Sequence, residues 1–385
     1  MVRAVRDGQS LRQVAREFNV SLSHVQRWVG RAGKERLERV EFSDHKNGPK
    51  VAANRTDAVM ENLVLEIRRY LKDESPLGEF GAVAIHRELA QRRIRPKTRP
   101  TVRTIGRILE RRGALDGRYR VRRPSPRPGW YLPHSQSELD SFDIIEGLRL
   151  EGGAQVEVLD VISLHGGLPG SWPRARIHAK TVVSAMLAHW REFGLPVYAQ
   201  FDNDNVFQGP HHRPDVIGRV SRVCLSLGVI PVFVPPRETG FQAAVENLNG
   251  RWQSKVWARF HFGRSRSALL AQSSKFVRAL RRRCAERITS APPRAPFPSD
   301  WQENLQEIAP GTIIYLRRTN DHGQVEMLGH RFDVASNWPH RLIRAEVDLK
   351  EGCIRFYALR RREPDHQPLL RTIPYSIPQR TRFRG

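Results

Sequence analysis

Three acidic residues, Asp143, Asp202 and Glu246, are far apart in the sequence, and each lies within or directly after a predicted strand or helix. Carboxylates that converge repel one another unless they are protonated or bridged by cations. Oxygen ligands favour Mg²⁺ or Mn²⁺ over zinc. Two such ions about 3.5–4 Å apart can activate a hydroxyl on one side of a phosphorus atom and stabilise the oxygen that leaves on the other side. The set therefore predicts phosphoryl transfer without a nucleophile from the protein.

Two of these acids have rivals nearby. A single Asp beside a turn is usually solvated or part of an Asx turn, so the prediction depends on the whole set. Asp143 is preferred to Asp140 because Phe and Ile flank it, as a buried strand requires. Asp202 follows the predicted strand VYAQF, and Asp204, two residues later, stays open as a further candidate.

The third acid lies on a predicted helix over residues 242–260. Helical spacing gathers its apolar residues into one stripe, and its polar residues share the opposite side. The stripe consists of Val245, Leu248, Trp252 and Val256, and the polar side of Gln242, Glu246, Asn249 and Gln253. Glu246 is therefore expected to face a cleft.

The surrounding segment, residues 138–290, reads as an α/β domain. A hairpin is predicted around Gly152 and Gly153, followed by a helix over 179–193, a strand, a helix over 216–227, and a strand over 229–234. Asp160 and Ser163 end the second hairpin strand, where a structural role in a turn is expected. A Pro-rich segment over 290–300 ends the domain, and short β-like runs over 306–385 predict a small basic β-barrel.

Residues 1–45 show a helix-turn-helix pattern. Apolar residues recur at helical spacing, namely Leu11, Val14, Phe18, Val25 and Trp28. Asn19 to Ser21 forms the joint, and Ser21 is placed to cap the second helix. The polar side chains of that helix are candidates for contact with the major groove of DNA. They are Ser23, His24, Gln26, Arg27 and Arg31.

Residues 56–123 predict a second helix-turn-helix or winged-helix-like unit, with its last helix beginning after Thr101. Its outward face carries Arg103, Arg107 and Arg111. Residues 92–127 contain fourteen Lys or Arg and only two acids, which favours phosphate contact over an ordinary solvated helix face. The run RVRRPSPRPGWYLP that follows predicts an extended linker that can lie along DNA.

Composition bounds the class of protein. A chain of 385 residues is long enough for two to four domains. Its formal net charge of +25 favours a polyanionic partner. The three cysteines are far apart, which excludes a disulfide framework and indicates a reducing cytoplasm. The sequence lacks the long apolar run of a membrane span and the apolar stretch of a signal peptide, so neither export nor a membrane partner is expected.

Residues 138–290 resemble the catalytic core of insertion-sequence transposases and retroviral integrases, a family with an Asp, Asp, Glu triad on a ribonuclease-H-like fold. The stretches that carry the resemblance are ELDSFDIIEG, VYAQFDNDNVFQG and GVIPVFVPPRETGFQAAVENLNGRWQSKVW. The order of modules, helix-turn-helix first and small β-barrel last, also resembles bacterial members. The spacing from Asp202 to Glu246 is 44, longer than the family's usual spacing, and residues 209–218 account for the insertion.

The resemblance implies that Asp143, Asp202 and Glu246 are ligands of two Mg²⁺ or Mn²⁺ ions. It also implies a multidomain chain with helix-turn-helix modules, an α/β ribonuclease-H-like core and a β-barrel. The expected function is cleavage and strand transfer of transposon DNA ends, by a homo-oligomer on end and target DNA in a bacterial, nucleoid-associated cytoplasm. Two alternatives remain open: a helix-turn-helix regulator with a catalytically inactive core, and a nuclease on the same fold.

Overall fold

The computed structural model describes residues 1–43, 56–115, 127–210, 213–238 and 240–378. Compact packing divides the chain into two units, Met1–Glu61 and Asn62–Gly385. Among the described residues, no helix has a stretch long and apolar enough to cross a membrane.

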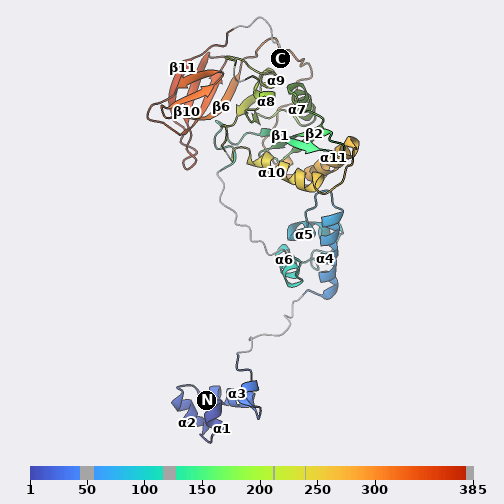
Figure 1. Ribbon diagram of the computed structural model, residues 1–385, viewed down its shortest axis with the longest axis vertical. Helices are drawn as coiled ribbons and strands as arrows, with labels where there is room; N and C mark the ends of the chain where they lie inside the picture. Colours follow the sequence, from blue (N-terminus) through green and yellow to red (C-terminus); the bar gives the residue numbers. More distant parts are fainter. Residues whose placement is uncertain (44–55, 116–126, 211–212, 239, 379–385) are drawn as a thin grey trace. The chain divides into compact units, whose positions relative to one another are not determined.

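The first unit is a small bundle of the helices α1 (Val2–Arg6), α2 (Leu11–Glu17) and α3 (Leu22–Ala32), followed by the 3₁₀ turn η1 (Leu37–Arg39) (Figure 1). Ser21 caps α3 by accepting a hydrogen bond from the backbone N–H of His24, as the sequence predicts. Asn19 turns the chain between α2 and α3 with a φ of 49°, a conformation that Asn tolerates. Val14 and Val25 form the core. Phe18, which shares the predicted helical spacing, is 46% exposed and lies outside that core.

Three further helices come next in the chain: α4 (Ala58–Asp73), α5 (Ala82–Gln91) and α6 (Val102–Arg111). Thr101 caps α6 by accepting from the backbone N–H of Thr104, as expected. Ile105, Ile108 and Leu109 are the buried side of α6. Residues 56–115 contain no strand, so the described part of this segment shows the predicted pair of helices and no wing.

In the described part of the chain, the second unit contains a nine-stranded sheet in the order β11-β10-β9-β6-β5-β4-β1-β2-β3. Strands β1 and β2 form the predicted hairpin, β3 extends it, and β4 and β5 run parallel to β1. This half of the sheet comprises β1 (Leu139–Arg149), β2 (Gln155–Ser163), β3 (Pro169–Arg174), β4 (Tyr198–Phe201) and β5 (Ile230–Phe233).

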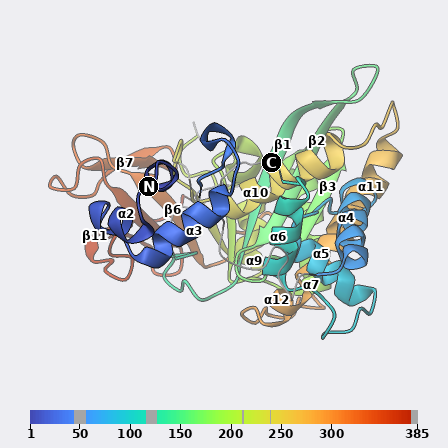
Figure 2. The ribbon, with the colours of Figure 1, turned by 90° about the horizontal axis from the view of Figure 1, so that it is seen from below.

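Helices cover both faces of these strands. Helices α7 (Ala179–Phe193), α8 (Asn205–Gln208) and α9 (Arg219–Ser226) share one apolar cluster with Phe142 and Leu159. The other face, with Ile145 and Val158, packs on α10 (Ala243–Trp252), the π-helical turn η2 (Gln253–Trp257) and α11 (Arg266–Arg283), which α12 (Ala285–Thr289) follows. Figure 2 shows α10 and α11 alongside β1, β2 and β3. Gly194 ends α7 with a φ of 82°, as predicted.

The predicted small β-barrel over 306–385 is not confirmed as a separate body. Its first strand pairs in parallel with β5, at Val232 with Ile314 and at Phe233 with Tyr315, so the C-terminal strands extend the core sheet (Figure 1). They are β6 (Thr312–Arg318), β9 (Leu342–Asp348), β10 (Cys353–Ala358) and β11 (Leu369–Pro374), with β7 (Gln324–Met327) and β8 (His330–Asp333) as a separate hairpin.

The predicted insertion also joins these strands to the core. Within it, Asp215 accepts a hydrogen bond from the Tyr375 hydroxyl at 2.7 Å and lies 2.9 Å from His330 Nε2. Gly218 approaches the backbone of Gln208 so closely that an added Cβ would lie 2.6 Å from its carbonyl oxygen. Residues 211 and 212 lie outside the described residues.

The predicted extended linker includes residues 130–133, and for these residues the prediction is wrong. Trp130, Tyr131 and Leu132 are buried, and they pack with Tyr198 and Phe241. These large apolar side chains gain more from burial than an extended path on the surface would allow. Residues 116–126, the more basic part of the run, lie outside the described residues.

Deletion of residues 306–385 should destroy cooperative unfolding of the core, because it uncovers the edge of β5 and the apolar residues that β6 buries. Deletion of residues 1–55 is the control, and it should leave the unfolding of the second unit unchanged. Circular dichroism during chemical denaturation measures both. A stable, cooperatively unfolding chain that ends at residue 305 would show that the C-terminal strands are a separable domain after all.

Candidate functional site

The two rival acids on β1 lie on opposite faces of the sheet. They are three residues apart, and successive strand residues point to alternate faces. Asp140 shares its face with Phe142 and contacts Trp190 of α7, whereas Asp143 shares its face with Ile145 and contacts Asn249 of α10. The two carboxylates therefore have different surroundings.

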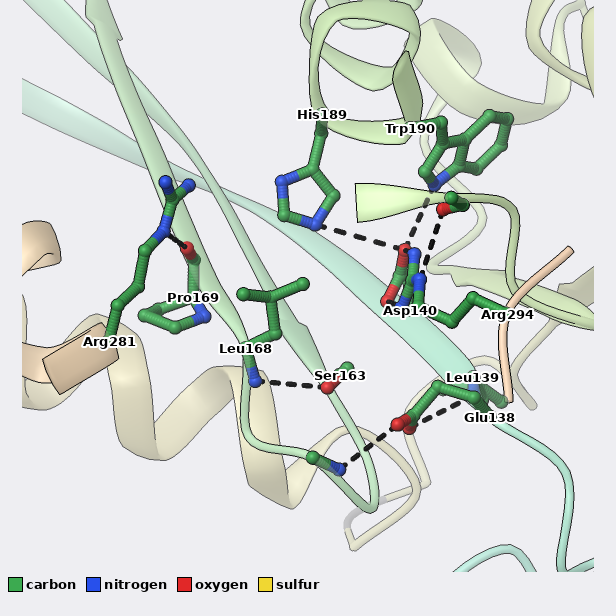
Figure 3. Close-up of polar contacts among 12 residues, drawn as sticks. Glu138, Leu139, Asp140, Ser163, Leu168, Pro169, His189, Trp190, Arg281 and Arg294 are labelled. Carbon is green, nitrogen blue, oxygen red and sulfur yellow. Dashed lines mark hydrogen bonds and ion pairs between the residues drawn. The ribbon is translucent and has the colours of Figure 1, made fainter. Parts of the chain in front are cut away.

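Asp140 is a structural acid. Arg294 donates to both of its oxygens, from Nη1 to Oδ1 at 2.9 Å and from Nη2 to Oδ2 at 2.6 Å, and Trp190 Nε1 donates to Oδ2 at 2.9 Å. Figure 3 shows Arg294 and Trp190 converging on this carboxylate, with the ring of His189 beside it. Burial raises the pKa of Asp140, but the hydrogen bonds and charge of Arg294 outweigh burial and hold that pKa below its usual value. Burial lowers the pKa of His189 to about 4, so its ring is neutral at pH 7.

Asp143 is held by neutral donors. Its Oδ1 accepts from the backbone N–H of Ile144 at 2.9 Å, and its Oδ2 accepts from Asn249 Nδ2 at 2.7 Å. About two helical turns earlier, Gln242 Nε2 donates to the carbonyl of Phe142 at 3.1 Å. The polar flank of α10 is thus fastened to β1, while the predicted apolar stripe of the helix is buried.

The register of β1 and β4 explains how Asp202 comes near Asp143. The strands pair in parallel with Ser141 opposite Gln200, so Asp143, two positions further along within β1, lies beside Asp202, which directly follows the last residue of β4. Adjacent strands are about 4.8 Å apart.

Asp202 and Glu246 both exert charge on Asp143. The pKa of Asp143 is raised to about 6, mainly by burial, and the charges of Asp202 and Glu246 raise it further against the hydrogen bonds from Ile144 and Asn249. Glu246 itself is exposed on the first turn of α10. The three acids predicted from the sequence therefore share one electrostatic neighbourhood.

Asp204 has a local structural task. Its Oδ1 accepts from the backbone N–H of Val206 at 2.7 Å and caps α8, and its own N–H donates to Asp202 Oδ1 at 3.0 Å. Helix capping accounts for an acid at this position. Asp204 thus shapes the turn that carries Asp202.

The expectation that Asp160 belongs to a turn is wrong. It lies within β2, directly opposite Asp143 on one side and Ser171 on the other, and it is fully buried. Burial raises the pKa of Asp160 to about 8, the Ser171 hydroxyl opposes this shift, and the charge of Asp143 adds to it. Neither carboxylate oxygen has a hydrogen bond of normal geometry within the described residues. The site thus has a fourth acid that is mainly neutral at pH 7.

Within the described residues, no group of three His, Cys, Asp or Glu side chains is arranged to hold a metal ion as it stands. The donor chemistry of Asp143, Asp202 and Glu246 nevertheless suits a hard cation, since all are carboxylates. The hydrogen bonds to Asp143 leave lone pairs free on both of its oxygens.

The candidate DNA-binding residues of the first unit lie on α3. Ser23, Gln26 and Arg27 are exposed. His24 is half-buried, and its Nε2 accepts the indole N–H of Trp28 at 3.0 Å. The guanidinium of Arg31 lies over the Trp28 ring, 5.1 Å from its centroid. Trp28 therefore orients two of the predicted side chains on the helix surface instead of filling the core.

The other candidate basic residues lie on α6 in the second unit. Arg103, Arg107 and Arg111 are exposed, on the side opposite the buried Ile105 and Leu109. The predicted outward face of this helix is thus present.

A family model described as a Homeodomain-like domain matches residues 1–40, which confirms the predicted helix-turn-helix. No curated protein matches this chain.

Solved structures that match include retroviral integrase cores and an intasome. A chain of the simian T-cell lymphotropic virus intasome, solved with the PP2A regulatory subunit B56 gamma, is 13% identical, with 70% of this chain and 91% of that chain covered and a TM-score of 0.33. The HTLV-2 integrase catalytic core domain, solved with magnesium, is 14% identical over 37% of this chain and 83% of that chain, with a TM-score of 0.26. The BIV integrase catalytic core domain is 15% identical over 36% of this chain and 80% of that chain, with a TM-score of 0.28.

Asn substitutions at the two β1 acids should have opposite effects on stability. Asp140→Asn leaves the Arg294 charge without its buried counterion and should lower the free energy of unfolding by about 3 kcal/mol. Asp143→Asn should maintain or raise it, because the substitution removes a partly buried charge that two other acids repel. Chemical denaturation at pH 7 measures both variants. Equal destabilisation by the two would contradict the assignment of structural and site roles.

Proposed function

We propose that this chain is a metal-dependent DNA transposase or integrase that cleaves DNA at transposon ends and joins the ends to a target. The observation that carries the proposal is the charge that Asp202 and Glu246 exert on the partly buried Asp143. Such a cluster of acids is unfavourable by itself and is relieved when cations bind. Phosphoryl transfer is the reaction class that uses this arrangement most directly.

Asp143, Asp202 and Glu246 are the residues that would hold two Mg²⁺ or Mn²⁺ ions. Bound there, such ions supply positive charge for the attacking and leaving oxygens of a phosphodiester. Asn249 orients the Asp143 carboxylate through its bond to Oδ2, and Gln242 fixes the start of α10 against β1. The chain thus contributes position and charge, and no side chain is needed as a covalent nucleophile.

The DNA-binding part of the proposal rests on the helix-turn-helix and on charge. The exposed side chains of α3 would read the transposon end, and the basic face of α6 would contact phosphates. A net charge of +25 supports binding to both end and target DNA. Because the reaction joins two DNA ends to a target, a homo-oligomer on DNA is part of the proposal.

One observation favours the second candidate, a helix-turn-helix regulator with a catalytically inactive core. In the described chain no three acidic, histidine or cysteine side chains already form a metal-binding group. The two functions differ in one property, since only the enzyme nicks labelled end DNA with Mg²⁺ and stops nicking when a chelator is added.

Glu246→Gln should reduce nicking and strand joining by more than about 100-fold, because it removes a ligand charge while preserving volume. Binding to end DNA should be unchanged, since α3 is untouched. Gel assays with labelled ends and a target duplex measure nicking, joining and binding separately. The control is Glu307→Gln, an exposed glutamate outside the three acids. Full strand joining by Glu246→Gln would count against the proposed reaction, and nicking without joining by the unaltered chain would favour a nuclease.

Arg27→Ala and Gln26→Ala should both weaken end binding, but in different ways. Loss of the Arg27 charge should lower the salt dependence of binding by about one unit of slope, whereas loss of a base contact by Gln26 should cost about 1–3 kcal/mol on the cognate end only. Fluorescence anisotropy at several salt concentrations measures both effects. Arg3→Ala, which removes an exposed charge from α1, is the control. Unchanged binding in both variants would exclude α3 as the reading helix.

A further inference from the structure

Arg317 on β6 is a buried guanidinium, only 7% exposed. Its Nη2 donates to Asn203 Oδ1 at 2.9 Å, and its Nη1 donates to the carbonyls of Leu316 at 2.8 Å and Val234 at 3.2 Å. Its Nε donates to the carbonyl of Glu326 at 3.3 Å. All of these acceptors are neutral oxygens.

A buried charge with only neutral partners lowers the stability of the fold. Desolvation of an ion is costly, and neutral acceptors compensate it less than a counterion would. Burial lowers the pKa of Arg317 to about 10, so the guanidinium is still charged at pH 7. The ring of Tyr315, 5.1 Å from the guanidinium carbon, adds a weak attraction. An apolar side chain would fill this space at lower cost, which indicates a role beyond packing.

The partner Asn203 is the residue directly after Asp202. Its Nδ2 donates to the carbonyl of Val234 at 2.7 Å, and this carbonyl also accepts from Arg317. The backbone N–H of Val234 in turn donates to the carbonyl of Phe201 at 3.1 Å. The turn that carries Asp202 is thus fastened to the ends of β4 and β5 and to β6.

We propose that Arg317 is a positioning residue that holds Asp202 beside Asp143 through Asn203. The C-terminal strands are then part of the support of the reaction centre. The guanidinium fork reaches Val234 and Asn203 at once, which a Lys ammonium cannot do in the same geometry. The inference rests on the proposed function, because it assigns Asp202 to the set that binds cations.

The test is cation binding and catalysis by the full-length Arg317→Met variant. Methionine is apolar and similar in length, and replacement of a buried charge by an apolar group is often tolerated. The affinity for Mn²⁺, measured by loss of the free-ion electron paramagnetic resonance signal, should fall about 10- to 100-fold, as is typical when a group that orients a ligand is lost. The Mg²⁺ concentration for half-maximal nicking should rise in parallel, while end-DNA binding is unchanged.

Arg355→Met is the matched control. Arg355 lies on β10 and pairs with Asp348 at 3.0 Å, so the substitution removes an arginine from the same group of strands. Its Mn²⁺ affinity and nicking should equal those of the unaltered chain.

Asn203→Ala removes the hydrogen bond between Arg317 and Asn203 but keeps the buried charge of Arg317. It should weaken Mn²⁺ binding as Arg317→Met does, and the double variant should be no weaker than either single variant, because both substitutions remove the same link. This variant keeps the inference testable if Arg317→Met fails to fold.

The outcomes separate the inference from the proposed function. If the unaltered chain binds Mn²⁺ and Arg317→Met and Asn203→Ala bind it equally well, the positioning role is overturned and the proposed function is unaffected. Additive losses in the double variant would also overturn a shared link. If the unaltered chain neither binds Mn²⁺ nor nicks DNA, the proposed function fails, and the inference fails with it.

Discussion

The parallel pairing of β1 with β4 is the constraint on which the candidate site depends. β4 ends at Phe201 while β1 continues to Arg149, so Asp202, at the carboxyl edge of β4, lies beside Asp143 within β1. The helix α10 brings Glu246 to the same edge because its apolar stripe has to be buried against β1 and β2. Strand pairing and burial of the apolar stripe of α10 therefore stabilise the arrangement of the three acids, whereas repulsion among the carboxylates opposes it.

Much of this arrangement can be predicted from local patterns. The caps Ser21 and Thr101, the turn glycines Gly152 and Gly153, and the end of α7 at Gly194 follow from rules that need only a few neighbouring residues. The stripe on α10 follows from helical periodicity. The preference for Asp143 over Asp140 follows from its apolar neighbours in sequence, Phe142 and Ile144. The structure adds that Asp140 already has a fixed partner in Arg294.

The parts that the sequence does not reveal depend on irregular or distant pairings. The register of the hairpin shifts between Ile145 and Leu148, where Gly147 has a φ of 77°. Without that bulge, Val161 would lie opposite Asp143, and with it the neighbour is Asp160. The pairing of β5 with β6 is equally hidden, because it joins strands almost 80 residues apart and has no local signal.

The surroundings on the two faces of β1 shift the pKa of an aspartate in opposite directions. On the α7 face, Asp140 is buried with a cation and stays ionised, so its charge contributes to the fold. On the α10 face, Asp143 is held by an amide and a backbone N–H, beside other acids, and its ionised form is disfavoured. Asp160 lies opposite Asp143 on the neighbouring strand, and its ionised form is disfavoured still more strongly. In the part of the chain that the structure describes, the hydrogen bonds to Asp143 come from neutral donors, so they do not neutralise its charge as Arg294 neutralises that of Asp140. Arg317 likewise donates to backbone carbonyls and to Asn203, so its hydrogen bonds reach neutral oxygens.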